Sequence, residues 1–251
     1  MTPITLIRCF RAALIALVIT YLCVPVIGVN RKILTFSGRQ WSVRNQTQAG
    51  PGPNNWDETN MFLDNKGHLH LKITNRNGNW SCAGVAGIER LGFGRYQFQI
   101  EGRIDRLDKN VVLGLFNYPP RDVGPDTTNE IDIEYAKWGN ANAKTGNFAV
   151  WPSASGRKQT SYRFDATLTG SYTTQSFIWR NDTILFSAQH GHQNNNRLNE
   201  YASWSFAPAS SLDIPQNPMP AMMNLWLFKG APPSDIREVE IVIHSFSFIP
   251  F

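Results

Sequence analysis

The segment Asn129-Glu-Ile-Asp-Ile-Glu-Tyr135 of the 251-residue chain alternates acidic and apolar residues, which is typical of a β-strand. Residues two apart in a β-strand project from the same face of a sheet. As a strand, the segment would direct three carboxylates to one face and two isoleucines and a tyrosine into the core. The three carboxylates belong to Glu130, Asp132 and Glu134.

Similar alternation recurs in short segments along the chain, separated by glycine, proline and asparagine. The clearest examples are residues 68–73, 96–100, 176–179, 183–186 and 239–243. A period of two predicts strands, and no segment after residue 28 shows a convincing helical period. Many short strands with frequent turns favour an all-β fold, either a sandwich or a jelly roll.

The composition is that of a packed globular protein, with 42% hydrophobic and 17% charged residues. Neither value fits a disordered chain. The net charge is +5, but no dense stripe of lysine and arginine occurs. Nucleic acid is therefore not expected as a partner.

The first 28 residues differ from the rest of the chain. Arg8 and Arg11 precede an apolar run from Ala12 to Cys23, which is the pattern of a secretory signal peptide. A retained membrane anchor is the alternative, although the run is short for a span of about 20 residues. We expect residues 1–28 to be the leader and residues 29–251 to be one domain. The protein would then be secreted or periplasmic, or anchored if the leader is not cleaved.

Cysteine and histidine usage limits the other sites that the domain could hold. Cys82 is the only cysteine after the leader, which excludes an intramolecular disulfide in the mature chain. His68 and His70 would share a strand face, but no third metal ligand is evident at a nearby spacing. No metal site is predicted, and we expect a monomer that does not contact a membrane after leader cleavage.

The three acidic residues at positions 130, 132 and 134 carry the chemistry that the sequence predicts. Neighbouring carboxylates cannot all ionise comfortably, so at least one pKa rises, and the arrangement gives the fold no stability. Cleavage of a glycosidic bond with retention needs a nucleophilic carboxylate and a protonated acid roughly 5–5.5 Å apart. A bowed sheet could bring the outer two together. An ordinary exposed acidic strand and a Ca²⁺ site remain alternatives on spacing alone.

Glu130-Ile-Asp-Ile-Glu134 resembles the active-site signature of the family 16 glycoside hydrolases, which include lichenases, laminarinases and xyloglucan endotransglycosylases. The resemblance covers most of the chain after the leader, in ordered segments. These are Phe36-Ser-Gly-Arg-Gln-Trp41, Asn65-Lys-Gly-His-Leu-His-Leu71, Gly92-Phe-Gly-Arg-Tyr96 and Ala221-Met-Met-Asn-Leu-Trp226. The regular spacing, without an inserted residue, is more similar to the lichenase and xyloglucan branch than to the laminarinases.

The resemblance implies a concanavalin-like jelly roll of two curved antiparallel sheets with a concave substrate cleft. It implies that Glu130 is the nucleophile, that Glu134 is the general acid/base, and that Asp132 assists. Asn224 and Trp226 match substrate-contacting positions of lichenases.

Two further residues are candidates for substrate binding. Asn55 matches a binding asparagine less closely. Trp138 follows the acidic strand and would either stack on a sugar or pack a loop against the sheet. In contrast, lichenases carry a substrate-binding Glu and Arg near residues 81–86, and Ser81-Cys-Ala-Gly-Val-Ala86 has neither. This departure puts the usual lichenan specificity in doubt.

Together these features predict a glycosidase that acts on O-glycosyl bonds: a retaining, endo-acting hydrolase of β-glucan-type polysaccharide that works by double displacement. Two alternatives stay open. One is a transglycosylase that uses the same residues on the same substrates, and the other is a carbohydrate-binding protein without turnover. No cofactor is expected, although some relatives hold a structural calcium ion.

Overall fold

The computed structural model describes residues 31–194 and 197–251, and the expected leader lies outside them. Residues Arg31–Phe251 form one compact unit. The described residues are almost entirely strands and connecting loops, which confirms the all-β prediction. Within the described ranges, no helix has the length and apolar character needed to cross a membrane. The short 3₁₀ turns are η1 (Glu58–Asn60), η2 (Ile104–Arg106), η3 (Ser211–Asp213) and η4 (Phe228–Gly230).

The first sheet contains the acidic segment near its middle, and all its neighbouring strands pair antiparallel. Its strands, in spatial order, are β1 (Ile33–Phe36), β2 (Arg39–Val43), β8 (Ala83–Leu91), β17 (Met219–Leu227), β10 (Val111–Asn117), β11 (Glu130–Ala136), β12 (Gly146–Trp151) and β13 (Thr160–Phe164).

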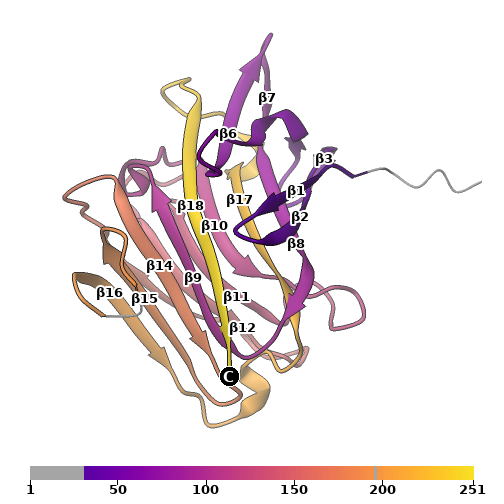
Figure 1. The fold of residues 1–251 in the computed structure, drawn as a ribbon, viewed down its shortest axis with the longest axis vertical. Coiled ribbons are helices and arrows are strands. Elements are labelled where there is room, and N and C mark those ends of the chain that lie inside the picture. Colours follow the sequence, from indigo (N-terminus) through magenta and orange to yellow (C-terminus); the bar gives the residue numbers. More distant parts are fainter. Residues whose placement is uncertain (1–30, 195–196) are drawn as a thin grey trace, which may run out of the picture. The chain divides into compact units, whose positions relative to one another are not determined.

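The second sheet packs against the first, and in Figure 1 its strands β14, β9 and β18 lie in front of β10, β11 and β12. Its strands, in spatial order, are β16 (Glu200–Phe206), β15 (Ile184–His190), β14 (Tyr172–Trp179), β9 (Gly94–Glu101), β18 (Val239–Pro250), β6 (Leu69–Arg76) and β5 (Met61–Leu63), and β7 (Asn79–Ser81) pairs with β6. A separate ribbon is formed by β3 (Gln46–Ala49) and β4 (Asn54–Trp56).

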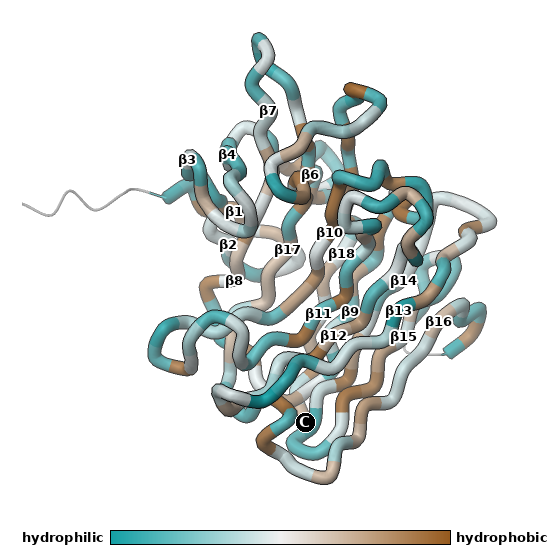
Figure 2. Tube along the Cα trace, turned by 180° about the vertical axis from the view of Figure 1, so that it is seen from behind, coloured by the Kyte–Doolittle hydropathy of each residue, from teal (hydrophilic) through white to brown (hydrophobic). Residues whose placement is uncertain are grey.

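The core lies between the two sheets and is built by alternate residues of each strand. Ile131 and Ile133 of β11 are fully buried, and so are Phe98 and Phe177 from the second sheet. Tyr135 continues the inward face of β11 and donates a hydrogen bond from Oη to Gln175 Oε1 of β14 at 2.8 Å. Along the strands in Figure 2 the colour changes between brown and teal, as this alternation requires. The inward face of β11 thus lies in the core.

The segments that the sequence predicts as strands are found in β6, β9, β14, β15 and β18. The two-sheet sandwich therefore agrees with the predicted fold class. Strand order follows from contacts between distant parts of the chain. For example, β10 pairs with β17 through Gly114↔Asn224, and these residues are far apart in the sequence. Short-range alternation carries no information about such a pairing.

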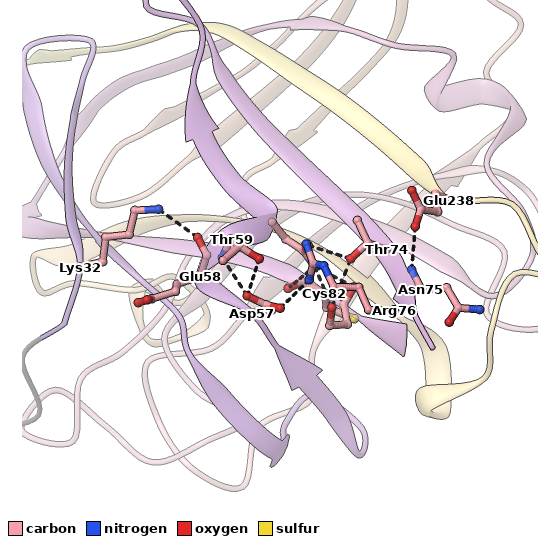
Figure 3. Close-up of polar contacts among 11 residues, drawn as sticks. Lys32, Asp57, Glu58, Thr59, Thr74, Asn75, Arg76, Cys82 and Glu238 are labelled. Atoms are coloured by element: carbon pink, nitrogen blue, oxygen red, sulfur yellow. Dashed lines mark hydrogen bonds and ion pairs between the residues drawn. The ribbon is translucent and has the colours of Figure 1, made fainter. Parts of the chain in front are cut away.

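A polar network fixes the segment that leads from β4 into η1 (Figure 3). Asp57 caps η1 by accepting from the Thr59 backbone N–H at 2.8 Å, and it forms an ion pair with Arg76 of β6. Asn60 is fully buried and donates to the Ser81 carbonyl at 3.0 Å. Buried polar groups are retained in a fold when they are hydrogen-bonded. The network therefore holds the β4 segment against the β6–β7 hairpin.

Candidate active site

The three carboxylates lie on the face of the first sheet that points away from the second sheet. They alternate along β11 with Ile131 and Ile133, which are fully buried in the core. The pairing of β11 with β10 and β12 continues through all three positions without a register shift. The predicted strand without an inserted residue is therefore confirmed. Within this row of acids, Asp132 is buried, and Glu130 and Glu134 are half-buried.

Residues directly opposite each other in antiparallel strands share a face of the sheet. The register accordingly defines a row across five strands, which we call the Glu134 row. Its members are Asn147 of β12, Glu134 of β11, Gly114 of β10, Asn224 of β17 and Gly84 of β8. Sequence reasoning predicted only Glu134 and Asn224 among them.

A hydrogen bond to Glu134 and the absence of a side chain on Gly114 shape the Glu134 row. Asn147 Nδ2 donates to Glu134 Oε2 at 3.1 Å. A Cβ atom on Gly114 would lie 2.4 Å from Asn224 Oδ1, so the Asn224 amide lies over this glycine. Asn224 Oδ1 is buried and has no hydrogen-bond partner among the described residues. The row therefore presents a carboxyl group and an unused acceptor on either side of a glycine.

The neighbouring positions of β12 serve the other two acids. Trp151 lies opposite Glu130, and its indole Nε1 donates to Asp132 Oδ2 at 3.0 Å. The Asp132 and Glu130 carboxyl groups are within hydrogen-bonding reach of each other. Asp132 thus contacts both a fixed donor and the predicted nucleophile.

Burial and mutual repulsion raise the pKa of all three acids. The pKa of Glu130 rises to about 8 and that of Glu134 to about 7, in both cases chiefly because burial disfavours the charged form. Burial and the neighbouring carboxylates also raise the pKa of Asp132 well above its ordinary range. Groups coupled in this way titrate as a set. The set therefore retains protons near neutral pH.

Asp132 and Glu130 lie close enough for an interaction between their carboxyl groups to contribute to the pKa of each. A proton shared by the pair stabilises the negative charge of the carboxyl group that is ionised. Glu134 has a separate partner, Asn147, and its own raised pKa. The arrangement can hold an ionised carboxylate and a protonated carboxylic acid on one strand at the same time.

The aromatic candidates lie together beyond the Glu134 row. Trp226 follows Asn224 by two residues on β17 and is buried. Its ring centroid is 6.3 Å from that of Trp138, which makes an edge contact with Phe228 at 5.6 Å. Trp138 has a left-handed backbone, with φ of 53°. These contacts place Trp138 as a half-buried residue that packs the loop after β11 against the end of β17.

The structure does not place Asn55 in the Glu134 row. Its side-chain Oδ1 accepts from the Gln48 backbone N–H at 3.2 Å, within the β3–β4 ribbon. Its backbone carbonyl accepts from Cys82 N–H at 2.7 Å. The contacts of Asn55 thus serve the ribbon and its attachment near β8.

The members of the site that sequence reasoning missed are Asn147, Trp151, Gly114 and Gly84. The alternation in Gly146-Asn-Phe-Ala-Val-Trp151 predicts that Asn147 and Trp151 share a strand face. Only the register with β11 reveals that this face meets the carboxylates. No described group of three or more His, Cys, Asp or Glu residues is arranged to hold a metal ion.

Comparisons with known proteins identify chains that are similar to this one. A curated beta-glucanase of Bacillus licheniformis is 24% identical over 173 residues, covering 68% of this chain and 62% of the relative. A solved Bacillus licheniformis beta-glucanase superposes with a TM-score of 0.63 at 18% identity, over 84% of this chain and 92% of that chain. A GH16 protein of the Bacteroides ovatus mixed linkage glucan PUL, in complex with a G4G4G3G product, superposes with a TM-score of 0.64 at 13% identity, over 83% and 94%.

These solved structures share the fold of the chain, a jelly-roll sandwich. The model of the family described as "Glycosyl hydrolases family 16" matches residues 53–235, which is more than half of the sequence and includes β11. This chain therefore belongs to glycosyl hydrolases family 16.

Proposed function

We propose that the protein is a retaining, endo-acting β-glycan hydrolase. The observation that carries the proposal is the unbroken strand face on which Glu130 and Glu134 stand in different environments. Glu130 is paired with Asp132, and Glu134 is paired with Asn147. Retaining glycosidases need two carboxyl groups in opposite protonation states. The different partners of Glu130 and Glu134 support such a division of roles.

In the first step, a carboxylate oxygen of Glu130 attacks the anomeric carbon of the bound sugar. The bond from that carbon to the glycosidic oxygen breaks, and Glu134 gives its proton to the departing oxygen. One part of the glycan leaves with a new hydroxyl group. The other part remains as an ester on Glu130.

In the second step, the ionised Glu134 removes a proton from a water molecule. The water oxygen attacks the anomeric carbon, and the ester bond to Glu130 breaks. Both carboxyl groups return to their starting states. Two inversions at the same carbon give a product with the starting configuration. Asn147 and the Asp132–Trp151 pair hold the two carboxyl groups in place during these steps.

We propose β-glucan-type polysaccharide as the substrate class. The curated relative is called a beta-glucanase, and the solved GH16 protein of the Bacteroides ovatus mixed linkage glucan PUL is in complex with a G4G4G3G product. Residues 81–86 lack the Glu and Arg expected of lichenases, so the preferred linkage is a separate question. A row of residues that crosses five strands suits an internal segment of a long chain better than a chain end.

The function is tested by incubating the purified protein with β-1,3-, β-1,4- and mixed-linkage glucans, xyloglucan and galactans. A hydrolase releases new reducing ends, and the first product keeps the β-configuration when it is observed by NMR. Redistribution of chain lengths with few new ends would identify a transglycosylase instead. Retardation in a polysaccharide gel without any product would identify a binding protein. An α-configured first product would contradict the retaining mechanism.

Replacing Gly114 with alanine is expected to lower kcat/KM by about 10–100-fold, the loss expected when about 1.4–2.8 kcal/mol of transition-state contact is removed. The new methyl group would meet Asn224 Oδ1, which lies only 2.4 Å from the Cβ position. The amide must move, and its alignment with the sugar is lost. The measurement is steady-state kinetics on the best glucan of the panel.

Gly156→Ala is the matched control for Gly114→Ala, because a Cβ atom on Gly156 would meet nothing within 4 Å. Its positive φ of 84° makes some loss of thermal stability expected, but kcat/KM should stay near the wild-type value. Equal kcat/KM values for wild type and Gly114→Ala would show that the position of the Asn224 amide does not matter for catalysis.

Replacing Arg163 with glutamine is expected to move the alkaline limb of the kcat/KM pH profile upward. Arg163 lies opposite Asn147 on β13, and its charge lowers the pKa of Glu134. Without this cation, Glu134 keeps its proton to a higher pH. The shift should be about 0.1–0.7 pH unit, as for an exposed charge, and should shrink in high salt. A downward shift would show that Glu134 does not set that limb.

A further inference from the structure

Arg44 extends the Glu134 row by one more strand. β2 pairs with β8 through Val43↔Val85, and the next backbone contact is a hydrogen bond from Arg44 N–H to the Gly84 carbonyl at 2.8 Å. A Cβ atom on Gly84 would lie 2.9 Å from Arg44 Cδ. Since Gly84 and Asn224 face the same side, the Arg44 side chain occupies the space above Gly84 on the carboxylate face.

The Arg44 guanidinium is held in one position by groups from the β3–β4 ribbon, which lies beside the β2–β8 end of the sheet (Figure 2). Its carbon lies 3.8 Å from the ring centroid of Trp56, which is 2% exposed. Nε and Nη2 donate to Gln46 Oε1 at 3.2 and 2.9 Å, and Nη2 also donates to the Gly50 carbonyl at 2.7 Å. A side chain fixed in this way loses little entropy when it binds a ligand.

The charge of Arg44 is left without an acidic partner in these contacts. The groups that hold it are a neutral amide, a carbonyl and an aromatic ring. Burial lowers its pKa to about 10, so it remains a cation near neutral pH. Its Nη1 group makes no hydrogen bond to any described residue. Six other arginines are held by ion pairs with carboxylates, whereas Arg44, like Arg95 and Arg163, has no such pair among the described residues. The six are Arg39, Arg76, Arg90, Arg103, Arg157 and Arg197.

We infer that Arg44 is a substrate-binding residue, whose guanidinium donates hydrogen bonds to sugar oxygens of the glycan at the far end of the Glu134 row. From β11 to β2 the row crosses four strand spacings, or about 19 Å. Gly84 lets the Arg44 side chain and the Trp56 ring lie directly on the sheet at this end of the row. The inference rests on the proposed function and adds a specificity residue to it.

The expected consequence is a dependence on chain length. Only a glycan long enough to extend from Glu134 to the β2 end can contact Arg44. Arg44→Gln should therefore raise KM for long β-gluco-oligosaccharides by about 10–100-fold, as for the loss of a hydrogen bond to a charged group. For the shortest oligosaccharides that are cleaved, both KM and kcat should match the wild type within about twofold.

Arg39→Gln is the matched control, because Arg39 stands on the same strand but is paired with Glu89. It should leave KM unchanged at every length. Arg44→Lys keeps the charge and loses the planar fork, so a partial effect on long substrates is expected. Arg44 also ties the β3–β4 ribbon to β2, and thermal unfolding of each variant measures that contribution separately.

Two outcomes would overturn the inference: an unchanged KM for the longest substrates in Arg44→Gln, or an equal loss for short and long ones with an unchanged unfolding midpoint. If Arg44→Gln does not fold, Arg44→Lys supplies the same comparison. A wild-type protein without activity would refute the proposed function but not the role of Arg44. Gel retardation by barley β-glucan then tests it, and retardation should be weaker for Arg44→Gln than for Arg39→Gln.

Discussion

Glu130→Gln should lower kcat by at least about 10⁴-fold, the scale on which loss of a catalytic nucleophile acts. The amide has nearly the same shape as the carboxyl group, but it carries no negative charge with which to attack the anomeric carbon. The measurement is reducing-end release from the best glucan of the panel. KM should change little, because the side chain still fills the same space beside Asp132.

The unfolding midpoint of Glu130→Gln distinguishes a loss of catalysis from a loss of folding. The pKa of Glu130 is raised in the folded protein to about 8, against an ordinary value of 4.5. Folding is therefore favoured by protonated Glu130 at low pH, and this contribution is lost as the pH rises from about 4.5 through about 8. Glutamine at position 130 does not ionise, so Glu130→Gln does not lose this stability as the pH rises. Its unfolding midpoint at pH 8 should equal or exceed that of the wild type.

Chemical rescue identifies the role of Glu130 directly. Glu130→Ala leaves space where the carboxylate was, and azide can enter it and attack the anomeric carbon from the same side. The product would be a glycosyl azide of inverted, α-configuration, and its formation should need an activated leaving group. Glu200→Gln is the control, because Glu200 lies on β16 of the second sheet and pairs with Arg197. Near-normal rates in Glu130→Gln would reject the nucleophile assignment.

The sequence predicted the acidic strand well because a period of two is a local property. The side chains of Glu130, Asp132 and Glu134 share a face whatever lies beside the strand. The burial of Ile131 and Ile133 follows from the same alternation. The likeness of residues 221–226 to a lichenase segment led to Asn224, which the register places in the same row as Glu134. Contact of Asn224 with substrate stays a prediction.

The remaining parts of the site depend on register and on loop packing, which local patterns do not encode. Asn147 contacts Glu134 because β12 pairs with β11 in one register, and a shift of one residue would reverse its face. Arg44 lies above Gly84 because β2 and β8 are neighbours, although they are far apart in sequence. The aromatic neighbours and backbone angle of Trp138 show how it packs against the end of β17, and its stacking on a sugar stays a prediction.

Glu134→Ala should divide substrates according to their leaving groups. On a natural glucan, kcat/KM should fall by about 10²–10⁴-fold, because a sugar alkoxide cannot depart without a proton. On an aryl β-glycoside with a dinitrophenyl leaving group, the first step needs no proton and should be nearly as fast as in the wild type. The second step should be slow, because no base activates water.

The same variant should respond to azide in the opposite stereochemical sense to Glu130→Ala. In Glu134→Ala the glycosyl ester on Glu130 still forms, and azide then attacks from the face that Glu134 vacated. The product is a β-configured glycosyl azide, measured by NMR, and the alkaline limb of the pH profile should disappear together with the group that produces it. Equal losses on glucan and on the activated glycoside would mean that Glu134 does not protonate the leaving group. Opposite azide products from two positions on one strand would require that their carboxyl groups act from opposite sides of one anomeric carbon.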